Sequence, residues 1–277
     1  MRKTQVILMD NGSLKAEATL QLRQLATQLS AASGHHIEAV SLRHADRIAP
    51  AQLSGRAAQT LHPYLSQQLQ AGEKSFIIIP LFFSQSGALT QYLANQIETL
   101  LSQFGLFDCT LANVIYPLPE GEPRLVELML QMLSQTVTRD IIVLDHGSPD
   151  PLVTAVRRHL TKQLSARVSP DRVIEEAVME RRQNAQYDFN GELLETVLQR
   201  KAHEGITEIF LLLQFFLPGR HAGSGGDIEQ ICQRVEAQFP ALKIHVSDLV
   251  ARNPLLLEIL LSRLREATDK HSCHSVG

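Results

Sequence analysis

The sequence has few cysteines, no long apolar run and no excess of either charge, and each absence excludes a class of protein. Cys109, Cys232 and Cys273 are widely spaced, which excludes a disulfide framework and a CxxC motif. The longest near-continuous apolar run, residues 76–83, is too short to span a bilayer. A formal net charge of −3 supplies no basic field for nucleic acid. We therefore expect a soluble, cytoplasmic protein that binds neither membrane nor nucleic acid.

A duplicated pattern accounts for the length of the chain. An aliphatic run ends in Asp-Asn-Gly-Ser at residues 10–13 and in Asp-His-Gly-Ser at residues 145–148, and a helical pattern follows each copy. A later pair, FIIIPLFF from Phe76 and FLLLQFFL from Phe210, repeats at nearly the same interval. The 277 residues suit two domains of ordinary size. The sequence thus predicts one architecture built twice, with a histidine kept only in the second copy of the turn.

Short apolar segments alternate with helical patterns in both halves. Alternating β and α elements favour a parallel sheet covered on both faces in each half. We therefore expect an α/β protein of two similar doubly wound domains, residues 1–136 with a degenerate site and 137–268 with the active site, followed by a flexible tail over 269–277. The segments expected to be strands buried on both faces are near residues 4–10, 37–42, 75–82, 110–116, 140–145, 173–179, 207–215 and 243–248.

His146 lies where an open parallel sheet collects functional groups, one residue beyond a predicted strand. Gly147 lets the backbone turn, Ser148 is a good helix N-cap, and Pro149 suits the first helical position. A well-formed turn explains the glycine and the serine but not the histidine, because Asn11 replaces it in the first copy. The sequence therefore indicates a functional role for His146.

A second histidine and a glutamate follow neighbouring predicted strands. His221 lies in the Gly-rich segment LPGRHAGSGGDI, whose backbone leaves room for a bulky ligand. Glu180, in EEAVMERR, aligns with Leu42 of the first half, and Gly87 takes the position of His221 there. Two imidazoles and a carboxylate can bind Co²⁺, Fe²⁺, Ni²⁺ or Zn²⁺ and can accept protons near neutral pH. The candidate catalytic and metal-binding residues are His146, Glu180 and His221.

These elements, in this order, resemble the sirohydrochlorin chelatases, the class II tetrapyrrole metal chelatases of sirohaem and cobalamin synthesis. The DHGS turn, the glutamate after the next strand and the PGRHAGSGGDI loop carry the resemblance, which covers almost the whole chain as two tandem domains. Two-domain members commonly keep their histidines in the first half, whereas this chain has them in the second. The resemblance implies insertion of Co²⁺, Fe²⁺ or Ni²⁺, as a substrate, into sirohydrochlorin or a related ring held between the halves. The resemblance also implies that no cofactor is permanently bound. It implies that the protein is a monomer or a homodimer.

Metal insertion requires delivery of the ion to one face of the ring and removal of two pyrrole protons. Neutral histidines with one carboxylate hold a metal loosely enough to release it. We expect His146 and His221 to hold the ion and accept protons, while Glu180 balances charge. Arginines can pair with the carboxylates that rim such rings. The expected substrate-binding residues are Asn11, Gly147, Ser148, Arg220 and Gly223.

Two other functions fit parts of the pattern. A non-catalytic metal or tetrapyrrole carrier would suit a first half that lacks the histidines, but a carrier needs no proton acceptor. An enzyme that uses Ser148 as a nucleophile would need the GxSxG turn, which is absent.

Some polar residues outside these motifs have an ordinary explanation. Glu175 and Glu176 are expected to be solvated strand-end charges. Arg181 and Arg182 follow Glu180 and are either solvated or paired with substrate carboxylates. A last cluster near the C-terminus is interpreted as either a disordered end or a transient metal-acquisition tail: His271, Cys273 and His274.

Overall fold

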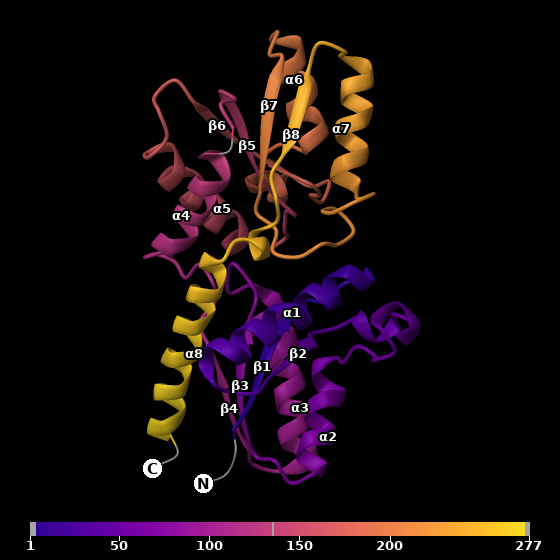
Figure 1. The fold of residues 1–277 in the computed structure, drawn as a ribbon, viewed down its shortest axis with the longest axis vertical. Coiled ribbons are helices and arrows are strands. Elements are labelled where there is room, and N and C mark those ends of the chain that lie inside the picture. Colours follow the sequence, from indigo (N-terminus) through magenta and orange to yellow (C-terminus); the bar gives the residue numbers. More distant parts are fainter. Residues whose placement is uncertain (1–3, 135, 275–277) are drawn as a thin grey trace. The chain divides into compact units, whose positions relative to one another are not determined.

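The computed structural model describes residues 4–134 and 136–274, and the chain divides into two compact α/β units (Figure 1). Unit 1 comprises Met1–Pro117 with Leu257–Gly277, and unit 2 comprises Leu118–Leu256. Each unit contains one four-stranded parallel sheet, with strand order β2-β1-β3-β4 in unit 1 and β6-β5-β7-β8 in unit 2. The predicted fold class, two similar parallel α/β domains, is confirmed.

In unit 1, strands and helices alternate along the chain as predicted. A π-helical turn, Ala88–Leu93, leads directly into the third helix. The elements of this unit are β1 (Gln5–Asp10), α1 (Ala16–Ser33), β2 (Ile37–Ser41), α2 (Leu61–Gln70), β3 (Ser75–Pro80), α3 (Ala94–Phe104), β4 (Asp108–Leu111) and α8 (Leu255–His274).

Unit 2 repeats this order, except that one helix precedes the first strand instead of following the last one. A 3-10 helix, Ala185–Asn190, lies between its second strand and the helix that follows. The elements are α4 (Pro123–Ser134), β5 (Asp140–Asp145), α5 (Pro151–Ser165), β6 (Val173–Val178), α6 (Leu194–His203), β7 (Glu208–Leu213), α7 (Asp227–Gln238) and β8 (Lys243–Val246).

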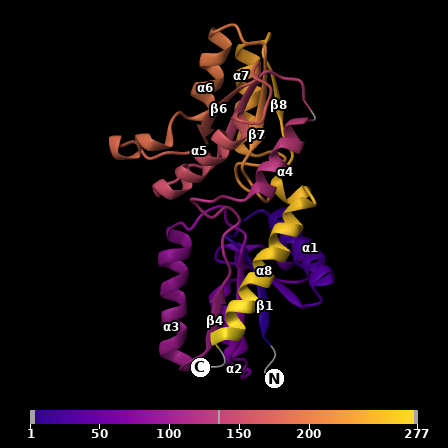
Figure 2. The same cartoon turned by 90° about the vertical axis from the view of Figure 1, so that its left-hand side faces the viewer.

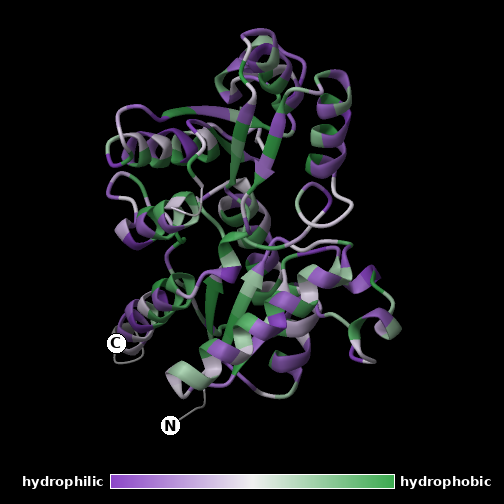
Figure 3. Cartoon of the chain, turned by 45° about the horizontal axis from the view of Figure 1, so that its top comes forward, coloured by the Kyte–Doolittle hydropathy of each residue, from purple (hydrophilic) through white to green (hydrophobic). Residues whose placement is uncertain are grey.

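The central strands are buried on both faces, which explains their uninterrupted apolar sequences. In β5, Ile142 and Leu144 belong to a cluster with residues of α6 and α7, and the intervening Ile141 and Val143 point to the opposite face. Figure 3 shows hydrophobic and hydrophilic colour alternating along the helices, as expected for helices that cover a sheet with one side only. Alternate strand residues therefore contribute to two separate layers of core in each unit.

The fourth strand of unit 1 is shorter than the segment predicted over 110–116. Pairing between β3 and β4 ends at Ile78 and Leu111. The following apolar residues remain buried because they pack beneath a loop, where Ile115 donates its N–H to the Phe82 carbonyl (2.8 Å). Burial therefore continues after the sheet has ended.

Two helices belong to a different unit from the one that the sequence repeat suggested. Helix α4 follows the sheet of unit 1 in sequence, but it packs against α5 and β7 of unit 2. Helix α8 follows the sheet of unit 2, but most of it belongs to unit 1, where it lies beside the sheet (Figure 2). The compact units therefore differ from the division at residues 136 and 137 that the repeat suggested.

Helix α8 is anchored by two buried polar side chains. Arg263 donates through Nε to the carbonyl of Val114 (2.9 Å). The ring of His271 lies between two hydroxyls, with Nε2 2.8 Å from Ser75 Oγ and Nδ1 2.7 Å from Thr110 Oγ1. The expectation of a flexible tail from residue 269 is therefore wrong for His271, which is buried in an ordered helix.

The rest of the C-terminal motif cannot be placed in the same way. Cys273 and His274 lie outside the residues whose side chains the structure describes. Within the described ranges, no helix combines the length and the apolarity needed to cross a membrane.

Candidate metal centre

The turn after β5 exposes His146 directly before a glycine whose backbone conformation favours glycine over other residues. Gly147 has φ 82°, and its N–H donates to Oδ1 of the buried Asp145 (2.9 Å). Exposed His146 precedes it and has Nδ1 2.9 Å from the Gly147 carbonyl oxygen. With Nδ1 turned to the backbone, Nε2 is the nitrogen available to a ligand.

The predicted N-cap of the following helix is wrong by two residues. Asp150 caps α5 by accepting a hydrogen bond from the Leu152 N–H (3.0 Å), and Pro151 occupies the first helical turn. Ser148 Oγ instead accepts from the Asp150 N–H (3.0 Å). The aspartate takes the cap because the turn is longer than the sequence suggested.

Glu180 reaches the same place because the chain after β6 runs against this turn. Its backbone N–H donates to the His146 carbonyl (3.0 Å). A side chain on Gly147 would collide with the Glu180 carbonyl oxygen, so glycine permits the close approach. The carboxylate itself remains 46% exposed and can move toward a ligand.

His221 completes the group from the loop after β7. Its Nε2 lies 3.1 Å from His146 Nε2 and 3.5 Å from Glu180 Oε1, and the two rings meet edge to face with centroids 4.6 Å apart. One ligand atom from each of the three residues lies within 4.8 Å of the others. The sheet order explains the meeting, because β5 lies between β6 and β7 and the three residues follow the ends of these strands.

The electrostatic environment favours neutral imidazole at His221. Burial lowers the pKa of His221, and nearby His146 lowers it further, against the opposing effects of Glu180 and Asp227. An imidazole that is neutral near pH 7 has a lone pair for a metal or a proton. Two Nε2 atoms 3.1 Å apart can both lie about 2.1 Å from one ion.

Asp227, at the start of α7, is a member of this cluster that sequence reasoning missed. Its Oδ2 lies 2.9 Å from His221 Nδ1, out of line for a hydrogen bond, and 3.2 Å from Arg220 Nε. Arg220 also contacts Glu180 Oε1 (3.2 Å). A helix-initiating aspartate has an ordinary capping role, so only the folded loop reveals its proximity to His221.

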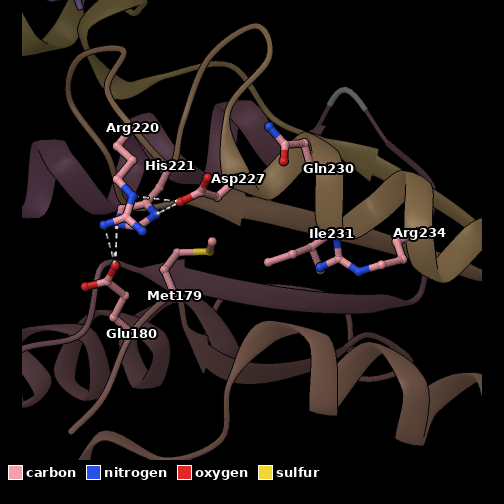
Figure 4. A pocket seen from close by; sticks show the side chains of 8 residues that line it. All are labelled: Met179, Glu180, Arg220, His221, Asp227, Gln230, Ile231 and Arg234. Atoms are coloured by element: carbon pink, nitrogen blue, oxygen red, sulfur yellow. Dashed lines mark ion pairs between the residues drawn. The ribbon is translucent and has the colours of Figure 1, made fainter. Parts of the chain in front are cut away.

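An open pocket of about 260 Å³ adjoins the centre on unit 2 (Figure 4). Figure 4 shows Arg220 between Glu180 and Asp227, with Met179 projecting toward Ile231 on the pocket's apolar side. The pocket thus combines cationic and apolar lining. Its lining residues are Met179, Glu180, Arg220, His221, Asp227, Gln230, Ile231 and Arg234.

Two other arginines from the sequence analysis are engaged within their own loop. Arg181 donates to the Gly191 carbonyl (3.0 Å), and Arg182 donates to Tyr187 Oη (2.8 Å) with its guanidinium over the same ring. Neither lines the pocket. Gly223 has φ 107° and keeps the His221 loop turned back on itself.

The equivalent turn of unit 1 has different side chains. Gly12 has φ 90° and approaches the Arg43 carbonyl oxygen as Gly147 approaches that of Glu180. Asn11 is exposed there.

The strand register corrects the predicted counterpart of Glu180. Asp10 pairs with Ser41 as Asp145 pairs with Val178, so the counterpart of Glu180 is Arg43 and not Leu42. Leu42 is 1% exposed and belongs to the core. The predicted alignment failed because it matched two EAV segments whose true pairing differs by one residue.

The first-half counterpart of His221 is less sharply defined. Gly87 lies immediately before the π-helical turn Ala88–Leu93, which has no equivalent in the loop of unit 2. The segments between strand and helix, residues 81–93 and 214–226, have the same length but different conformations, and the register of β3 and β7 puts Ala88 and not Gly87 at the position of His221. Within the described residues, a group of three side chains that could hold a metal ion occurs in unit 2 alone.

Comparisons with known proteins agree with this architecture. Residues 140–267 match the CbiX family. SirB from Bacillus subtilis with Fe³⁺ has a TM-score of 0.69 at 16% identity, over 98% of both chains. SirB from Bacillus subtilis subspecies spizizenii in complex with cobalt has a TM-score of 0.68 at 14% identity, over 97% of this chain and 96% of that one.

A third structure, CbiX, the terminal enzyme for biosynthesis of siroheme in denitrifying bacteria, has a TM-score of 0.57 at 13% identity, over 95% of this chain and 99% of that one. A search of curated protein sequences found no match. The second half of this chain thus matches the CbiX family, and the whole chain has the two-domain fold of the SirB and CbiX structures. The predicted family is confirmed.

Proposed function

We propose that this protein inserts Co²⁺ or Fe²⁺ into sirohydrochlorin or a related metal-free tetrapyrrole. The observation that carries the proposal is the convergence of His146, Glu180 and His221, with ligand atoms within 4.8 Å, in the half that matches the CbiX family. Two imidazoles and one carboxylate suit these borderline ions, and Ni²⁺ fits the same ligands. The metal is a substrate that the centre delivers.

Metal insertion at this centre requires two proton transfers and no electron transfer. Two pyrrole N–H bonds break as the ring nitrogens take the ion from its protein ligands. Each Nε2 that loses the metal regains a lone pair, so His146 and His221 can accept the released protons. The half-exposed Glu180 then passes protons to water.

The groups around the centre supply contacts for the ring. Arg220 is 75% exposed and contacts both Glu180 and Asp227. When Glu180 turns toward the ion, Arg220 is free to pair with a carboxylate on the ring. Gly223 lies in the His221 loop and Ser148 in the His146 turn, and neither lines the pocket beside Arg220.

An anaerobic metallation assay tests the proposal. Sirohydrochlorin is incubated with Co²⁺, Fe²⁺ or Ni²⁺, and the absorption change of the ring gives the rate with and without protein. We expect a rate well above the uncatalysed one, and we expect His146→Ala to lower this rate by orders of magnitude. His245→Ala removes an exposed histidine that contacts Glu208 at 2.9 Å, outside the group of three, and should leave the rate unchanged.

The assay also distinguishes an enzyme from a carrier. A carrier would bind the metal, and His146→Ala would weaken that binding, but the wild-type protein would not accelerate metallation. That result would refute the chelatase proposal.

A further inference from the structure

Arg157 is a fully buried charge directly behind the His146 turn. It lies in α5, is 1% exposed, and donates to Asp145 Oδ1 (2.7 Å) and Glu176 Oε2 (2.9 Å). A third hydrogen bond goes to the backbone carbonyl of Asn190 (2.6 Å). Glu176 is therefore a partner of this arginine and not the solvated charge that the sequence suggested.

The carboxylate held by Arg157 also holds the turn. Asp145 Oδ1 accepts from Arg157 and from the N–H of Gly147, the residue directly after His146. A buried carboxylate needs such partners, because burying a charge without them is costly. The guanidinium thus fixes the carboxylate, and the carboxylate fixes the backbone that carries the His146 ring.

Asn190 holds the next residue of the same turn. It is 1% exposed, accepts from the Ser148 N–H (3.0 Å) through Oδ1, and donates through Nδ2 to the Ser148 carbonyl (2.8 Å). Both backbone polar groups of Ser148 are therefore fixed by one side chain. Since Arg157 holds the backbone of Asn190, the two residues act as one support.

Unit 1 provides an internal comparison, since it has the same turn without this support. The strand register makes Asp10 the counterpart of Asp145. The position in α1 that corresponds to Arg157 is Leu22, an apolar core residue that is 1% exposed. Oδ1 of buried Asp10 has no hydrogen-bond partner.

The counterpart of Asn190 in unit 1 is also apolar. The Ser41 N–H donates to the Gln59 carbonyl as the Val178 N–H donates to the Glu192 carbonyl, so Ala57 takes the place of Asn190. The turn with His146 thus has Arg157 and Asn190 behind it, whereas the turn with Asn11 has Leu22 and Ala57 at those positions, and its Asp10 carboxylate is held by the Ser41 side chain and the Gly12 backbone.

We propose that Arg157 and Asn190 are positioning residues that fix the His146 turn in the geometry needed to share a metal ion with His221. The inference rests on the proposed function of the His146 centre. Partners behind metal ligands orient them, and their loss typically costs about 10–100-fold in metal affinity or activity. Positioning matters at this turn because a His146 imidazole displaced from His221 could not ligate the same ion.

The test uses Asn190→Ala, which removes both contacts to Ser148 but keeps the backbone carbonyl that Arg157 binds. We expect Co²⁺ to bind about 10–100-fold more weakly, with changed visible ligand-field bands and a higher KM for the metal. In the metal-free protein, the NMR signal of the His146 ring, assigned with His146→Ala, should shift or broaden. Arg157→Leu should also weaken Co²⁺ binding, and Arg157→Lys should weaken it less than Arg157→Leu does.

Leu198→Ala is the matched control for stability, since Leu198 is a fully buried core residue of α6 outside the network. Equal loss of Co²⁺ affinity in Leu198→Ala and Asn190→Ala would overturn the inference, because the effect would then be general destabilisation. An unchanged His146 signal together with unchanged Co²⁺ bands in Asn190→Ala would overturn it too. If these readouts respond but wild-type protein metallates no ring, the positioning role stands and the chelatase proposal fails.

Discussion

The α-carbon of Gly147 lies so close to the backbone carbonyl of Glu180 that no side chain fits between them. This contact joins the ends of β5 and β6 and brings His146 beside Glu180. It depends on a residue with φ 82° and no side chain.

We expect Gly147→Ala to destabilise unit 2 by at least about 2 kcal/mol and to abolish metal binding, because the chain must separate at the contact. Gly12→Ala makes the same collision with Arg43 in unit 1 and should cost similar stability while leaving metal binding intact. Chemical unfolding and Co²⁺ titration of both variants measure the two effects. Loss of metal binding in Gly12→Ala would contradict the assignment of the centre to unit 2.

His146→Ala should lower the metallation rate by about 10²–10⁴-fold while leaving the fold intact, because it removes a metal ligand and a proton acceptor. Asn11→Ala should have a far smaller effect, because an amide cannot act as a base. Both residues are exposed in equivalent turns, so structural effects should be similar. Equal rate losses in the two variants would show that the centre has been assigned to the wrong place.

Asp10 should make unit 1 less stable as the pH rises. Burial raises the pKa of Asp10 from 3.8 to about 6, so between these values the folded state binds more protons than the unfolded state. The free energy of unfolding of unit 1 is therefore highest below about pH 4. It falls as the pH rises through about 6, by at most about 3 kcal/mol.

Asp10→Asn should remove this dependence and increase the free energy of unfolding at pH 8. Denaturant unfolding from pH 4 to pH 8 measures the change. Asp145→Asn is the matched comparison: it should destabilise unit 2, because it leaves the buried charge of Arg157 without one of its two carboxylates. A loss of stability at pH 8 in Asp10→Asn would show that this carboxylate has a charged partner in solution.

His271→Ala should destabilise unit 1 by about 1–3 kcal/mol, because it removes the partner of Thr110 Oγ1 and one partner of Ser75 Oγ in a buried region. Thermal unfolding compared with exposed Asp269→Ala measures this effect. Metal uptake at low Co²⁺ concentration should not change, since His271 is held in the helix–sheet contact. Reduced uptake would restore the hypothesis of a metal-acquisition tail.

Local patterns predicted the elements that depend on neighbouring residues in the chain. The DHGS turn was recognisable because a strand end, a glycine and a helix start are consecutive in sequence. The counterpart of Glu180 was missed because strand alignment depends on pairing with a neighbour. An apparent EAV match placed Leu42 where the register places Arg43. The partners Asp227, Arg157 and Asn190 were missed because each resembles an ordinary helix or loop residue.

The sequence by itself determined the two parallel α/β units and the glycine turn that presents His146, since apolar runs and turn residues act over a few positions. The tertiary structure decided which distant side chains meet. His146 and His221 are 75 positions apart, and they lie 3.1 Å apart because β5 pairs directly with β7. The tertiary structure also decided which unit each of two helices belongs to, with α4 in unit 2 and most of α8 in unit 1. Amphipathic helices specify that they must cover a sheet, and only the packed fold specifies which sheet.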